Sequence, residues 1–173
     1  MSRLKEAYEN CLEKNQLRNI DPAKHVAAKE LKEAEFDLEE AHKSFENQNY
    51  KWPVIESYYS CFHAARCLLF LIGLKEKSHF CVYAALSAVF NEYFGNEELE
   101  NYKKAMQRRE LADYYASYSK EEAESAINFT EKFIKKVKIL YEKLKNLDSR
   151  LLRKIRDSLS LKVLDEEKQN AQG

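Results

Sequence analysis

The feature that most constrains the fold is an apolar stripe between residues 27 and 45. Apolar side chains recur there at alternating steps of four and three positions, at Ala27, Leu31, Ala34, Leu38, Ala41 and Phe45. Such steps keep the side chains on one face of an α-helix. Comparable stripes run through 55–72 and 123–144. Because 173 residues contain only 3 Gly and 2 Pro, turn formers are too few for an all-β fold, and the pattern predicts long helices joined by short loops.

Local signals place the ends of the first two long helices. Asp21-Pro22 is typical of a helix start, because an acceptor side chain precedes a proline at the first helical position. The polar residues 47–49 are expected to end this helix. A second helix is expected to begin at Trp52-Pro53 and to close at Gly73 in a left-handed cap.

The remaining signals continue the same pattern to the end of the chain. Ser78 is the expected cap of a third helix that ends at Gly95, and a fourth helix covers about 97–118. Residues 119–122, Ser-Lys-Glu-Glu, form a capping-box pattern ahead of the 123–144 stripe. Asp148 is the expected cap of a basic helix over 151–161, and the polar stretch from Asp165 is expected to be disordered.

We therefore predict an all-α fold. Its main part, residues 21–146, is an antiparallel up-and-down bundle of four to five helices. Residues 1–20 form an N-terminal helical extension, and residues 147–173 form a basic C-terminal helix with a disordered tail. No apolar run approaches the roughly 20 residues that cross a bilayer, and the first residues lack the apolar stretch of a secretory signal. We expect a cytoplasmic protein that does not contact a membrane.

The four cysteines, at positions 11, 61, 67 and 81, include no Cys-x-x-Cys pair. We therefore expect no metal site and no cofactor, and a disulfide framework is not expected in a reducing compartment. Cys61 and Cys67 fall within an apolar run and are interpreted as small core residues.

The first group of candidate site residues lies in the second helix. Glu56, Tyr59, His63 and Arg66 follow one side of it, within a run of apolar and aromatic residues. Polar groups in such a run need partners, since burying them unpaired costs free energy. Two interpretations stay open. The residues form a polar network that fixes the register between helices, or they line a cleft where a histidine and an arginine bind an anion.

Residues 58–69, together with the segment Arg109-Glu110-Leu111-Ala112-Asp113-Tyr114, resemble a HEPN domain over roughly residues 26–144. HEPN proteins are small helical proteins often encoded beside minimal nucleotidyltransferases in prokaryotic toxin–antitoxin pairs. The resemblance implies a homodimer and a nucleotidyltransferase partner. It also implies a role in a toxin–antitoxin or stress-response module.

Ribonucleases of this family resemble one another in an arginine followed, after four to six residues, by a histidine, and they cleave RNA without metal. Arg109 matches the arginine (Arg108 is a substitute), but Tyr114 stands where the histidine is expected. A tyrosine hydroxyl with a pKa near 10 is a poor acid or base at neutral pH. Asp113 can pair with Arg109 instead. Whether the chain is an enzyme stays open, and we favour a protein that binds a nucleotide, an RNA or a partner.

The expected ligand-binding residues are Tyr59, His63, Arg66, Arg109, Asp113 and Tyr114, with Lys77, Ser78 and His79 as a weaker phosphate-site candidate at a helix start. One alternative is a metal-independent RNase toxin in which Arg109 acts with His63 or Tyr114. Another is a helical adaptor without a small ligand. The adaptor would dock through the segment 132–156. This segment contains ten Lys or Arg and only two acidic residues, Glu142 and Asp148.

Overall fold

The computed structural model describes residues 3–170 and is helical apart from two three-residue strands. Its elements in chain order are α1 (Arg3–Glu13), β1 (Leu17–Asn19), α2 (Lys24–Glu46), α3 (Lys51–Leu71), β2 (Leu74–Glu76), α4 (His79–Val89), α5 (Asn91–Tyr115), α6 (Lys120–Leu144), α7 (Ser149–Ser158) and α8 (Val163–Asn170). The predicted all-α fold is confirmed.

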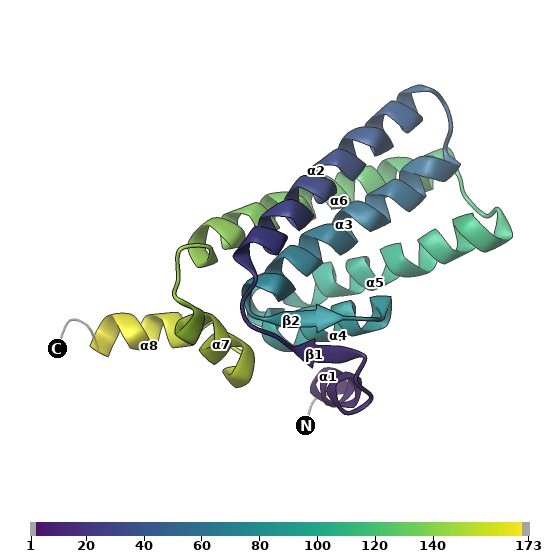
Figure 1. Ribbon diagram of the computed structural model, residues 1–173. Helices are drawn as coiled ribbons and strands as arrows, with labels where there is room; N and C mark the ends of the chain where they lie inside the picture. Colours follow the sequence, from purple (N-terminus) through teal and green to yellow (C-terminus); the bar gives the residue numbers. More distant parts are fainter. Residues whose placement is uncertain (1–2, 171–173) are drawn as a thin grey trace.

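Helix α3 is the centre of the bundle. It packs against α2, α4, α5 and α6. Figure 1 shows α2, α3 and α6 as long helices side by side, with α5 along the other flank of α3 and with α7 and α8 projecting beyond one end. Fifteen of the 21 residues of α3 are buried, which explains why its sequence is apolar on nearly every face.

Several predicted helix ends are confirmed. Ser119 Oγ accepts a hydrogen bond from the Glu122 amide at 3.1 Å, and Asp148 Oδ1 accepts from the Leu151 amide at 2.8 Å. Gln48 has a φ of 60° in the turn after α2, as expected for the break at 47–49. Ser78 precedes α4, although its side chain makes no capping bond.

Two predicted ends are wrong. Helix α2 starts at Lys24 rather than directly after Asp21, with Ala23 as the residue before it. The third predicted helix ends at Val89, because a new helix begins at Asn91 and continues through Gly95. Gly95 marks a kink inside α5 with φ +77° and ψ 165°, a conformation essentially reserved for glycine.

The strands β1 and β2 pair antiparallel, with Leu17 opposite Glu76 and Asn19 opposite Leu74. The sequence predicted residues 1–20 to be a helical extension and predicted no strand, so this small sheet is a correction. Gly73 closes α3 with φ +78°, as predicted, and its carbonyl accepts bonds from the Ile20 amide at 2.9 Å and from Arg156 Nη1 at 3.1 Å. The sheet and α7 therefore hold the N-terminal segment against the bundle.

The cysteines require a second correction. Cys11 and Cys81 form a disulfide that links α1 to the first turn of α4. Cys61 and Cys67 are free and fully buried, as predicted. The segment from Asp165, predicted to be disordered, continues α8 as far as Asn170; the last three residues of that predicted tail lie outside the described residues. Within residues 3–170, no helix is long and apolar enough to cross a membrane.

Candidate functional site

One surface-reaching strip of α3 brings most of the predicted site residues together. We define the α3 strip as Tyr58, Tyr59, Phe62, His63 and Arg66, which face α2, β2, the start of α4 and α5. Tyr59, His63 and Arg66 are partly exposed, whereas Tyr58 and Phe62 are buried. Two further side chains complete it, His79 from α4 and Arg109 from α5.

At one end of the strip, His63 and Arg66 are paired with carboxylates. His63 Nδ1 donates to Glu30 Oε2 at 2.7 Å, and Arg66 Nη1 lies 2.9 Å from Glu30 Oε1. Arg66 Nε lies 2.9 Å from Glu76 Oε1, and His63 Nε2 lies 3.8 Å from Asp37 Oδ2. These contacts form the polar network between helices that the sequence predicted as one interpretation. An arginine held by two carboxylates has little capacity left for a further anion.

At the other end, Arg109 has one carboxylate partner, Asp113, at a longer distance. Its guanidinium carbon lies 5.4 Å from the centre of the Tyr58 ring and 5.8 Å from that of Tyr59. The residue is 8% exposed, and among residues 3–170 its Nε has no hydrogen-bond partner. The ion pair with Asp113 is long, at 3.9 Å, and the Asp113 carboxylate is half-exposed. A buried cation with an unpaired donor favours the approach of an anion.

His79 lies beside the same tyrosines. Its ring stacks on Phe62, with the ring centres 4.2 Å apart and an angle of 11° between the planes, and its Nδ1 lies 2.7 Å from the Tyr58 hydroxyl. Burial lowers the pKa of His79, and the positive charges of Arg109 and Arg66 lower it further. Burial also raises the pKa of Tyr58. The Tyr58 hydroxyl therefore stays protonated beside a neutral imidazole, and Arg109 carries the positive charge at this end of the α3 strip.

The other predicted residues are placed differently. Tyr114 is 72% exposed and lies about 140° around α5 from Arg109, since five residues at about 100° each separate them. Lys77 is exposed and Ser78 partly exposed, directly before His79. Glu56 is on α3, with Oε2 buried and unpaired among the described residues, and its carboxyl pKa is raised by burial. Tyr114 thus presents its ring outward and away from the α3 strip.

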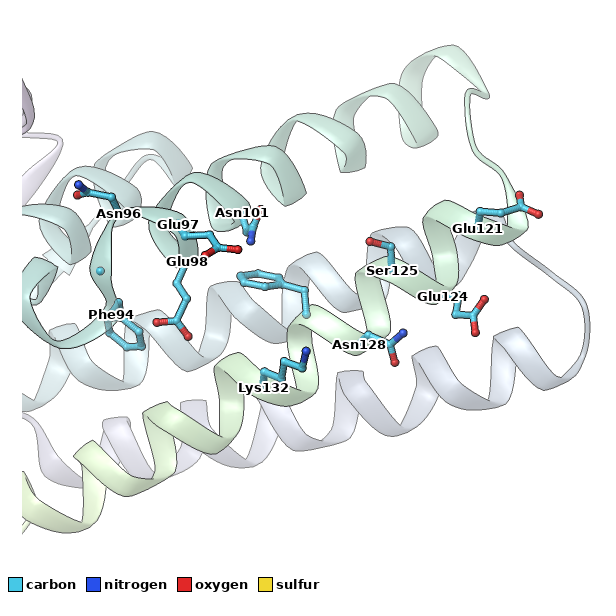
Figure 2. A pocket seen from close by; sticks show the side chains of 12 residues that line it. Phe94, Asn96, Glu97, Glu98, Asn101, Glu121, Glu124, Ser125, Asn128 and Lys132 are labelled. Carbon is cyan, nitrogen blue, oxygen red and sulfur yellow. The ribbon is translucent and has the colours of Figure 1, made fainter.

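A hollow lies elsewhere, between the start of α5 and the first half of α6. It encloses about 820 Å³ beside Gly95. Figure 2 shows carboxylates and amides along both of its walls, with Lys132 at one side. Its charged lining residues are Glu97, Glu98, Glu121, Glu124 and Lys132. An acidic lining repels phosphate, so this hollow is not a candidate for an RNA or nucleotide site.

The basic segment 132–156 is more neutral in the structure than in the sequence. Lys136, Lys138 and Lys145 pair with Glu98, Glu35 and Glu142. On α7, Arg150 and Lys154 lie near Glu167, and Arg153 near Asp21. Arg156 is buried against the β1–β2 sheet. Much of the charge that suggested a docking face is thus paired within the chain.

The α3 strip was only partly predictable. The sequence identified Tyr59, His63, Arg66 and Arg109, but not Tyr58, which contacts both Arg109 and His79. It also did not identify Glu30 or Glu76 as the partners of His63 and Arg66. A signal for Glu30 was present, because it lies one position before Leu31 of the first apolar stripe, at the edge of the face that packs on α3.

The bundle and the α3 strip define a small helical protein with a buried arginine. Its guanidinium lies over two tyrosine rings, and its Nε has no partner among the described residues. Residues 27–140, about two thirds of the chain, match the HEPN domain family. The chain belongs to this family. It is 37% identical over 112 residues to a protein named "Putative toxin MJ0605" from Methanocaldococcus jannaschii, an alignment that covers 61% of this chain and 81% of the relative. The first finding gives the family, and the second shows similarity to a protein that is named as a putative toxin.

Proposed function

We propose that this HEPN protein is of the toxin type and that it binds the phosphate of an RNA or a nucleotide at Arg109. The observation that carries the proposal is the buried guanidinium of Arg109, whose Nε is unpaired within the described residues. Nε is buried, so a local shift of the side chains around it would let a phosphate oxygen accept its N–H and compensate the charge. The partly exposed Tyr59 ring, 5.8 Å from the guanidinium, offers a surface on which a base can stack.

His63 and Arg66 support this site from the other end of the α3 strip. Phe62 connects the two ends, since it stacks on His79 and lies 5.5 Å from the Arg66 guanidinium carbon. The pairs with Glu30 hold α3 against α2, and so fix the position of Tyr59 relative to α5. In this proposal Tyr59, Arg109 and Asp113 surround the ligand, and His63 and Arg66 position the helix.

The weaker candidate, Lys77-Ser78-His79, is part of the same proposed site through His79. The residue begins α4, and it contacts Tyr58, over which Arg109 lies. The amides at the start of a helix favour negative charge. A phosphate bound at Arg109 would also make protonation of His79 more favourable, because it offsets the positive charge that lowers the His79 pKa.

The binding experiment compares neighbouring arginines. Labelled total RNA is titrated with the wild-type protein, with Arg109→Ala and with Arg108→Ala, in EDTA at fixed salt. Loss of a charge-assisted bond to phosphate costs about 1.5–3 kcal/mol, so Arg109→Ala should weaken binding by roughly tenfold or more. Arg108→Ala removes the same charge from the same helix and should weaken binding by less than about threefold. Equal effects of the two variants, with the fold intact by circular dichroism, would contradict the proposed site.

A second candidate function is metal-independent RNA cleavage. It is favoured by the neutral imidazole of His79 beside Arg109, which supplies the acid–base group that Tyr114 does not. This candidate predicts cleavage in EDTA that is lost in both Arg109→Ala and His79→Ala. Cleavage that persists in either variant, or that requires magnesium, would exclude it.

We also propose that the protein pairs with a second copy, and that it acts with a minimal nucleotidyltransferase in a toxin–antitoxin module. The end of α5 and the turn after it carry four exposed apolar or aromatic side chains, Leu111, Tyr114, Tyr115 and Tyr118. Such a patch is typical of a protein–protein interface. The variant Tyr114→Lys/Tyr115→Lys should be monomeric in light scattering. A dimer that survives this change would exclude the patch as its interface.

A further inference from the structure

The N-terminal segment precedes the residues that match the HEPN family. A covalent bond attaches this segment to the bundle. Helix α1 packs on α4, strand β1 pairs with β2, and the disulfide joins Cys11 to Cys81 across 70 positions. Cys11 precedes the matched range of 27–140, whereas Cys81 lies inside it. The bond therefore connects a residue before the matched range to a residue within it.

The two sulfur atoms of this disulfide have different surroundings. Cys11 is 4% exposed and lines a hollow of about 300 Å³ with Ala7, Asn10, Lys14, Gln16 and Phe80. Cys81 is fully buried in the first turn of α4 and does not line this hollow. Since only Cys11 borders a space that opens to solvent, an external thiolate can approach Cys11 Sγ and not Cys81 Sγ.

The charges at the two ends favour the same direction of reaction. Lys14 lines the hollow, and its ammonium group attracts a thiolate. Cys81 is the third residue of an 11-residue helix, where the partial positive charge of the helix N-terminus stabilises a leaving thiolate. A low-pKa leaving thiol speeds exchange.

We propose that Cys11–Cys81 is a redox modification site that a dithiol reductant opens by attack on Cys11. The attacking thiolate forms a bond to Cys11 Sγ, the Cys11–Cys81 bond breaks, and Cys81 leaves as a thiolate that takes up a proton. The second thiol of the reductant then attacks its own sulfur in the mixed disulfide. This step releases Cys11 as a thiolate, which is protonated in turn. Two electrons pass to the protein, and the reductant leaves as a disulfide.

Reduction removes the covalent link but leaves the packing of α1 on α4. The expected result is faster opening of α1 and of the first turn of α4, where Cys81 lies two positions after His79. The proposal concerns the thiols and does not depend on RNA binding at Arg109.

The experiment traps the mixed disulfide in the full-length protein. Oxidised wild-type protein is treated with a limiting amount of glutathione, quenched with an alkylating agent and mapped by peptide mass spectrometry. The adduct is expected on Cys11. The variants Cys81→Ser and Cys11→Ser are treated with glutathione disulfide under native conditions, and only Cys81→Ser should gain a glutathione. Cys61 and Cys67 are internal controls, because burial raises their thiol pKa to about 12 and both should stay unmodified.

Three results would overturn the proposal. The first is an adduct on Cys81 rather than Cys11. The second is four titratable thiols in the denatured protein purified without reductant, since the two free cysteines account for only two. The third is reduction that proceeds only at the rate of global unfolding. If a serine variant fails to fold, the mapping on the wild type still decides between Cys11 and Cys81.

Discussion

Breaking the Cys11–Cys81 bond should cost the fold a large and calculable part of its stability. The bond closes a loop with a sequence separation of 70 that contains α2, α3 and both strands. In the chain-entropy account, the stabilisation at 25 °C is 298 K times about 2.1 + 1.5R ln 70 cal/mol/K, or about 4.4 kcal/mol. Almost all of it acts on the unfolded chain, which gains freedom when the link is removed.

The assay is urea denaturation of the oxidised wild type, of the reduced wild type and of Cys11→Ala/Cys81→Ala. The oxidised form should be more stable than the reduced form by about 4 kcal/mol, which raises its Tm by roughly 8–16 °C for a chain of this size. The double variant should be at most as stable as the reduced wild type, since it also loses two buried sulfur atoms. A difference below about 1 kcal/mol between the oxidised and reduced wild type would refute the reasoning. Such a result would mean that α1 separates from the bundle independently of global unfolding. The disulfide would then not restrict the unfolded chain of the bundle.

Three further predictions concern the bundle and the α3 strip. Glu30→Gln leaves two partly buried cations, His63 when protonated and Arg66, with weaker partners, and should destabilise the fold by about 1–3 kcal/mol in urea. Gly73→Ala places a Cβ atom 2.4 Å from the Ile20 carbonyl at φ +78° and should cost at least about 2 kcal/mol. The fold holds the pKa of His79 below 6.5, so the unfolded chain binds more protons just below pH 6.5. Wild-type stability should therefore fall between pH 7 and pH 5 more steeply than that of His79→Phe.

The first two of these predictions each have a matched control variant. Glu35→Gln removes a carboxylate whose ion pair with Lys138 is about half-exposed, and it should change stability by less than about 0.5 kcal/mol. Ala116→Gly, at an exposed position with φ +49°, should not destabilise the fold. If Glu30→Gln matched Glu35→Gln, the network would not hold the helices together. If His79→Phe kept the full pH dependence, other groups would be its source.

The sequence determined the bundle well because helical periodicity is a local signal. The stripe from Ala27 to Phe45 requires only neighbours three and four positions apart, and the caps at Ser119 and Asp148 act over three residues. The two strands gave no such signal. Three residues are too few for an alternating pattern, and residues 17–19 are separated from 74–76 in the chain by α2 and α3.

Contacts across long separations explain the rest. His63 and Arg66 lie in an apolar run, so the sequence indicates that they need polar partners. Many acidic residues precede them, and no local pattern identifies Glu30 as the partner. The pairing of Cys11 with Cys81 likewise cannot be read from four cysteines, which allow three arrangements of two bonds. The family motif predicted that Arg109 and Tyr114 lie in one site. The helix turns Tyr114 outward, and a histidine from another helix, His79, lies beside the tyrosines that hold Arg109.

The most direct test of the account is the NMR resonance of the Arg109 Nε–H group. The site is proposed because this donor is buried and has no partner within the described residues. A short 5′-phosphorylated RNA is added to the ¹⁵N-labelled wild type, with Arg109→Lys used to assign the signal. The account predicts a downfield shift of the Arg109 Nε–H and slower exchange with water. Saturated RNA binding with this resonance unchanged, and with shifts confined to the lysines of α6, would contradict the account.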